Sequence, residues 1–90
     1  METIIGWDAE EAFAERMADA ARVAGVPELD AILSLLEAGE YGLVVADVIR
    51  AGVPVTTADI ELALYAFSDA ASPHVAKFVR RAVEFAKITA

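Results

Sequence analysis

His74 is the single histidine of the chain, and it follows Ser72 and Pro73 at the start of a predicted helix. A catalytic histidine needs a nucleophile or a carboxylate beside it, and the spacing of the sequence identifies none. With one histidine and no cysteine, the chain cannot form a two-histidine zinc site, a thiolate metal site or a disulfide. We therefore interpret His74 as an ordinary polar residue of a first helical turn.

Carboxylates are the most frequent side chains that could do chemistry, with fifteen Asp and Glu residues against seven Lys and Arg. They group in two places, Asp8 with Glu10 and Glu11, and Glu37 with Glu40. General acid–base catalysis needs carboxylates whose pKa values are pushed apart in a partly dry cleft, whereas these groups fall at helix ends and on polar faces. No calcium loop and no glycine-rich phosphate loop occurs. We predict that the protein is not an enzyme and that it holds no cofactor and no metal ion.

The charge is distributed unevenly along the chain. Residues 1–49 contain eleven acids and two bases, and residues 50–90 contain four acids and five bases. The negative half repels phosphates, so we expect no nucleic-acid partner. It would attract a basic protein, although acidity can also serve solubility alone. Four basic residues on the last predicted helix are interpreted as a solvated face or an internal complement to the acidic helices: Lys77, Arg80, Arg81 and Lys87.

Tyr41 is the aromatic residue with the most unusual surroundings. It lies between Gly39 and Gly42, beside Glu37 and Glu40, where two predicted helices meet. A tyrosine flanked by acids at a helix corner suits an interface anchor, because it offers a large contact area at low entropic cost. The alternative is a tyrosine that packs over the helix junction with its hydroxyl in water.

The elements that must position these residues are helices. Ninety residues suffice for one domain, residues 1–90, and twenty alanines favour helix over strand. We expect an all-α bundle of about five short helices. The first is capped by Asp8 and Glu11, with Trp7 as a staple, and it ends at Gly25. The second runs from about Pro27 to Ala38.

The last two helices carry clear start signals. Thr56 and Asp59 form a capping-box pattern for the fourth helix, and Ser72 with Pro73 opens the fifth. The expected inward face of the fourth helix contains Ile60, Ala63, Leu64 and Phe67. The expected inward face of the fifth contains Val75, Phe78, Val79, Ala82, Phe85 and Ala86.

The third segment, residues 41–51, is ambiguous. Its β-branched residues would suit a strand, but a lone strand in a helical domain has no partner. The segment is followed by Gly52 and Pro54, which together are typical of a helix end. We predict a helix here and keep the strand as the alternative.

The corner around Tyr41 resembles a known family. Residues 35–43 read Leu-Leu-Glu-Ala-Gly-Glu-Tyr-Gly-Leu, followed by an apolar–acidic helix over 44–49 and by Gly-Val-Pro-Val-Thr at 52–56. This is similar to the small bacterial immunity proteins of the MafI type, in which a leucine-rich helix ends in a Glu-x-Gly-Glu-x-Gly-Leu turn. The resemblance covers about 25 residues.

The resemblance implies a cytoplasmic protein that protects its producer by binding a cognate toxin domain, often a nuclease with a basic cleft. We expect the partner to contact Glu37, Glu40, Tyr41 and Asp47. The absence of cysteine is also typical of the cytosol, and no apolar stretch approaches the roughly 20 residues that span a bilayer, so we expect no membrane partner. The alternative function is a helical scaffold that acts through homo- or hetero-oligomerisation, and a homodimer is compatible with the broad apolar helix faces.

Overall fold

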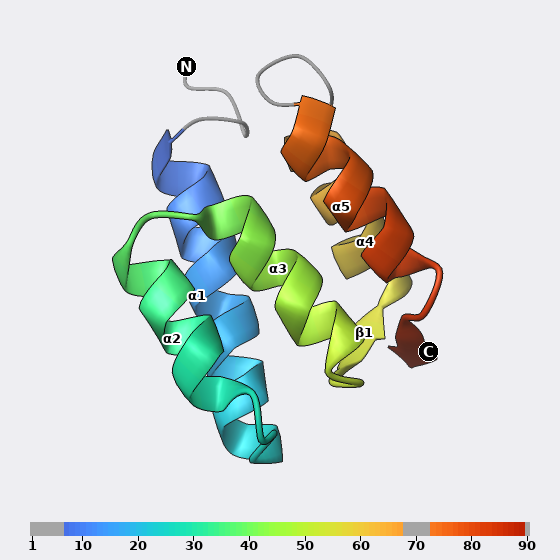
Figure 1. Cartoon of the computed structure of the whole chain (residues 1–90). Coiled ribbons are helices and arrows are strands. Elements are labelled where there is room, and N and C mark those ends of the chain that lie inside the picture. Colours follow the sequence, from blue (N-terminus) through green and yellow to red (C-terminus); the bar gives the residue numbers. More distant parts are fainter. Residues whose placement is uncertain (1–6, 68–72, 90) are drawn as a thin grey trace.

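The computed structural model describes residues 7–67 and 73–89. It is an all-α bundle of five helices that run alternately up and down, with two short strands at one end (Figure 1). The elements in chain order are α1 (Trp7–Ala24), α2 (Leu29–Glu37), α3 (Tyr41–Arg50), β1 (Pro54–Thr56), α4 (Thr57–Ala66), α5 (Pro73–Val83) and β2 (Lys87–Thr89). The predicted fold class is confirmed, whereas the strand pair was not expected.

Helix α3 is the centre of the bundle and packs against α1, α2 and α5. The helix prediction for this ambiguous segment is confirmed. A helix that is apolar on nearly all sides is buried, and packing in the core outweighs the lower helix propensity of its β-branched residues. The buried residues of α3 are Tyr41, Gly42, Val44, Val45, Ala46, Val48 and Ile49.

The short turns between the first three helices follow the predicted stops. Gly25 and Gly39 have φ angles of +69° and +79°, which is the left-handed region that ends helices and that glycine adopts without steric penalty. Helix α2 is slightly shorter than expected, and the chain reverses at each turn. Consequently α1 and α2 lie side by side and antiparallel (Figure 1). The expected capping contacts of Trp7, Asp8 and Ser72 involve side chains outside the described part of the chain.

Helix α4 begins with the predicted capping box. The Asp59 amide donates to Thr56 Oγ1 at 3.0 Å, and the Thr56 amide donates to Asp59 Oδ2 at 3.3 Å. Arg16 of α1 donates to the same carboxylate at 2.8 Å. Burial raises the pKa of Asp59, but the hydrogen bonds from Arg16 and Thr56 outweigh it, so this pKa lies below its ordinary value. The start of α4 is thereby tied to α1.

Two expectations about the inward faces are wrong. Helix α5 ends at Val83, and Phe85 is 73% exposed. The physical reason is that the chain must leave the helix to bring β2 beside β1, where Val55 pairs with Ile88 in a parallel register. Leu64 is 39% exposed, because α4 packs on α5 and β1 and leaves part of its surface uncovered.

Candidate functional site

A groove with a volume of about 660 Å³ lies between α1 and α2 and reaches the start of α3. We call it the acidic groove. It is lined by Glu11, Glu15, Arg22, Asp30, Leu33, Ser34, Leu36, Glu37 and Tyr41. It contains two of the four residues that the sequence predicts for partner binding, Glu37 and Tyr41.

Helical spacing explains why these side chains share one groove. Glu11 and Glu15 are one turn apart on α1, and Asp30 and Glu37 are two turns apart on α2, so each pair lies on a single helix face. The antiparallel arrangement of α1 and α2 places the two acidic faces against a shared apolar floor of leucines. Two consecutive helices thus contribute carboxylates to one surface.

The charge of the acidic groove is not neutralised by the groove's own side chains. Four carboxylates and one arginine give it a formal charge of −3. Arg22 pairs with Asp19 outside the groove, and Arg16 pairs with Asp59 at the start of α4. Within residues 7–67 and 73–89, neither of these salt bridges includes a groove carboxylate. The groove therefore presents its negative charge to whatever approaches it.

Tyr41 and Glu40 are adjacent in sequence but differ in exposure, since Tyr41 is buried and Glu40 is open to solvent. Tyr41 is 9% exposed and belongs to the hydrophobic core, so its ring forms part of the groove wall and does not protrude. Glu40 is exposed at the N-cap of α3, makes no capping hydrogen bond and does not line the groove. The structure brings Glu37 and Tyr41 together and leaves Glu40 on the rim.

Asp47 is separated from the other three predicted residues. It lies six residues after Tyr41 on α3, about 9 Å along the helix axis, close enough to Glu28 for the two charges to interact. Burial raises the pKa of Asp47, Arg50 lowers it, and Glu28 at the start of α2 raises it further. The net result is a raised pKa, so the ionised form is less favourable here than in water.

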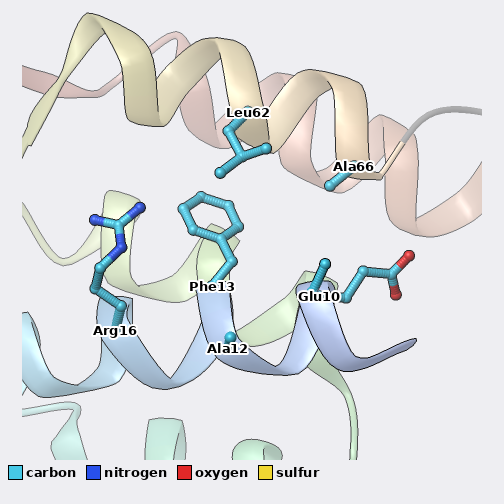
Figure 2. A pocket seen from close by; sticks show the side chains of 7 residues that line it. Glu10, Ala12, Phe13, Arg16, Leu62 and Ala66 are labelled. Atoms are coloured by element: carbon cyan, nitrogen blue, oxygen red, sulfur yellow. The ribbon is translucent and has the colours of Figure 1, made fainter. Parts of the chain in front are cut away.

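A second hollow of about 580 Å³ lies between α1 and α4 and is mostly apolar. Phe13 of α1 faces Leu62 of α4 across it, with Arg16 and Glu10 toward its two ends (Figure 2). Arg16 is already engaged with Asp59 and lies 5.2 Å from the centre of the Phe13 ring. Burial raises the pKa of Glu10. This hollow offers an apolar wall with one carboxylate, which suits contact with an apolar group.

Sequence reasoning missed most of the acidic groove. It did not select Glu11, Glu15, Arg22 or Asp30 for partner binding, because it sought the site at the Tyr41 corner. The signal was present as acids at helical spacing on two consecutive helices joined by a short turn. Such helices are usually antiparallel neighbours, so their acidic stripes could have been placed together.

The described residues contain no group of three or more His, Asp or Glu side chains that could hold a metal ion. In the same part of the chain, no helix is long and apolar enough to cross a membrane. Searches of protein-family models, curated proteins and solved structures find no match to this chain. The geometry of the acidic groove is consequently the main basis for a function: exposed carboxylates on a rigid helical pair can bind cationic side chains through charge-assisted hydrogen bonds.

Proposed function

We propose that this protein binds and neutralises a cognate toxin domain by capturing a basic surface of that domain in the acidic groove. The observation that carries the proposal is the set of four carboxylates that α1 and α2 direct into one groove without salt-bridge partners among the described residues. The resemblance of residues 35–43 to MafI-type immunity proteins supports a toxin as the partner. In this proposal the protein acts in the cytoplasm of the producing cell.

Electrostatics would act mainly on the rate of encounter. Complementary charge raises association rates and orients the partners, while a small number of buried contacts determine how long the complex lasts. The half-buried leucines of the groove floor, Leu33 and Leu36, are suited to form the buried contacts that prolong the complex. Protection from a toxin requires nanomolar affinity, equivalent to about −12 kcal/mol.

The interface must extend beyond the groove. A stable protein–protein interface buries about 800 Å² on each partner, which is about 15% of the 5488 Å² of accessible surface of this chain. The rim of the groove therefore joins the contact, and Glu40 lies there, three residues after Glu37. Asp47 would take part only if the partner also covers the start of α2.

The test compares two double variants with the same change in net charge. Glu15→Gln with Glu37→Gln removes two groove carboxylates, and Glu61→Gln with Glu84→Gln removes two exposed carboxylates elsewhere. Each variant is used as bait against extracts of the native host and against the toxin-like domain encoded beside the gene, where there is one. We expect a basic partner that the wild-type chain and the control retain and that the groove variant loses. Equal retention by all three chains would refute the groove as the binding site.

A helical assembly module is the second candidate function, and the exposed apolar side chains favour it. Leu64 and Tyr65 on α4, together with Phe85, are large hydrophobic residues open to solvent. Sedimentation velocity distinguishes the two proposals. A stable homo-oligomer without a basic partner would support assembly, and a monomer that binds a basic domain would support neutralisation.

A further inference from the structure

A further pocket, positively charged, lies where the end of α3 meets α5. It has a volume of about 320 Å³ and is lined by Arg50, Phe78, Arg81 and Phe85. We call it the arginine pocket. An adjoining hollow of about 270 Å³ shares Phe78 and Arg81 with it and adds His74 and Lys77. The chain as a whole has a net charge of −8, whereas the side chains that line these two hollows include basic groups and no carboxylate.

Arg50 stacks on an aromatic ring of the pocket, and neither pocket arginine takes part in a salt bridge between described residues. The Arg50 guanidinium lies 5.3 Å from the centre of the Phe78 ring, a cation–π contact that leaves its N–H groups free to donate. The salt bridges between described residues are formed by Arg16 and by Arg22. Asp47 is near enough to Arg50 to interact with its charge, but the two form no salt bridge.

Phe85 gives the pocket an exposed aromatic face. The turn after α5 carries Phe85 out of the core, so that 73% of the residue is open to solvent. A single exposed apolar residue is common on protein surfaces, but this ring lines the same pocket as two arginines. Aromatic rings and arginines together are the usual means of binding a flat ring next to an anionic group.

We propose that the arginine pocket binds a small phosphorylated compound that carries a flat ring, of which a nucleoside monophosphate is the simplest biological form. The guanidinium groups of Arg50 and Arg81 hold the phosphate, and the ring stacks on Phe85. Two arginines match the charge of about −1.5 to −2 of a phosphate monoester. The volume lies at the lower end of the range for small-molecule pockets, which starts at about 300 Å³.

Two other anionic partners fit the pocket less well. An acidic peptide could pair with the arginines, but its carboxylate side chains bring no flat ring for Phe85. A nucleic-acid strand would extend from the pocket over a molecule that is strongly negative elsewhere. A small ligand avoids this repulsion, because the acidic groove is lined mainly by α1 and α2, and these helices lie on the opposite side of α3 from α5 (Figure 1). Salt also screens charges beyond about 8 Å at physiological ionic strength.

The experiment titrates the whole chain, labelled with nitrogen-15, with adenosine monophosphate, inorganic phosphate, adenosine and a short poly-glutamate peptide. We expect adenosine monophosphate to shift the amide signals of Arg50, Phe78, Arg81 and Phe85. Arg50→Gln and Arg81→Gln should each weaken its binding about tenfold or more. Phe85→Ala should weaken the binding of adenosine monophosphate about fivefold or more and leave that of inorganic phosphate unchanged.

Arg22→Gln is the matched control, because it removes the same charge at the acidic groove and should leave the affinity unchanged. Circular dichroism of Phe85→Ala should match that of the wild-type chain, since the residue is exposed. The proposal is overturned if adenosine monophosphate causes no shifts at millimolar concentration, if the two arginine variants bind as the wild type does, or if the peptide binds more tightly than the nucleotide. None of these outcomes depends on whether the acidic groove captures a basic partner.

Discussion

Gly42 lies where α3 is pressed against the α4–α5 side of the bundle, and we expect Gly42→Ala to destabilise the protein. A methyl group added at this position would overlap with Cγ1 of Val75 on α5 and lie 3.2 Å from Cδ1 of Phe67. Gly42 is the second residue of α3 and is buried. In an uncrowded helix the same substitution would be stabilising, so the sign of the effect tests the packing directly.

The magnitude follows from two opposing terms. Alanine is favoured over glycine in a helix by up to about 1 kcal/mol. Against this, the added carbon and Val75 Cγ1 would have to move apart by roughly 1.1–1.6 Å to reach the ordinary packing distance of about 3.5–4.0 Å. Inserting a methyl group into a packed core costs about 1–3 kcal/mol. We therefore expect a net loss of about 1 kcal/mol, with an upper limit near 2 kcal/mol.

The assay is urea unfolding of four chains: wild type, Gly42→Ala, Val75→Ala and the double variant. Val75→Ala removes the methyl group that the new side chain would meet, so in that background Gly42→Ala should become neutral or slightly stabilising. The coupling between the two sites should be about 1–3 kcal/mol. If Gly42→Ala raised the free energy of unfolding equally in both backgrounds, the close approach of α3 and α5 would be refuted.

Three further predictions concern stability and its dependence on pH. The pKa of Asp59 is lowered on balance, because the hydrogen bonds from Arg16 and Thr56 outweigh the effect of burial. The ionised Asp59 side chain therefore stabilises the fold at pH values above its ordinary pKa of 3.8, and this stabilisation is lost as the pH falls through the lower pKa of the folded state. Asp59→Asn should flatten the dependence of the unfolding free energy on pH in that acidic range. The pKa of Asp47 is raised, chiefly by burial, so its ionisation opposes folding as the pH rises through the folded value. Asp47→Asn should stabilise the chain at neutral pH, and a thermal melt that shows a loss would contradict this reasoning. Ile49→Ala in the fully buried part of α3 should cost about 2–5 kcal/mol, measured by the same urea unfolding, and a cost below about 1 kcal/mol would place Ile49 outside the core.

The helices were predictable because their signals are local. Thr56 and Asp59 cap α4 through contacts that span three residues, and Gly39 stops α2 through its own backbone angle. The strand pair was not predictable, since Val55 and Ile88 are 33 residues apart and each strand contains three residues. The same long-range pairing removed Phe85 from the fifth helix, although its spacing continued the apolar stripe of that helix.

The candidate site was predictable only in part, and for a similar reason. The acidic character of the first half could be read from composition, and Glu37 was correctly placed at a helix end. Which acids share a surface depends on how α1 rotates against α2, and single-helix patterns do not determine that angle. Tyr41 illustrates the limit: the flanking acids and glycines left both an interface anchor and a ring packed over the helix junction open, and the structure buries the ring while it still lines the groove.

Helices α1 and α2, which line most of the acidic groove, lie on the opposite side of α3 from α5, which lines the arginine pocket (Figure 1). This separation of negative and positive groups gives the molecule an electric dipole moment. On a positively charged chromatography resin or sensor surface, the protein should adsorb through α1 and α2 and leave α5 facing the liquid. Immobilisation by charge would then hide one surface from its ligands while displaying the other. Attachment through a negatively charged support would reverse that orientation, so the choice of support determines which of the two surfaces a binding measurement can detect.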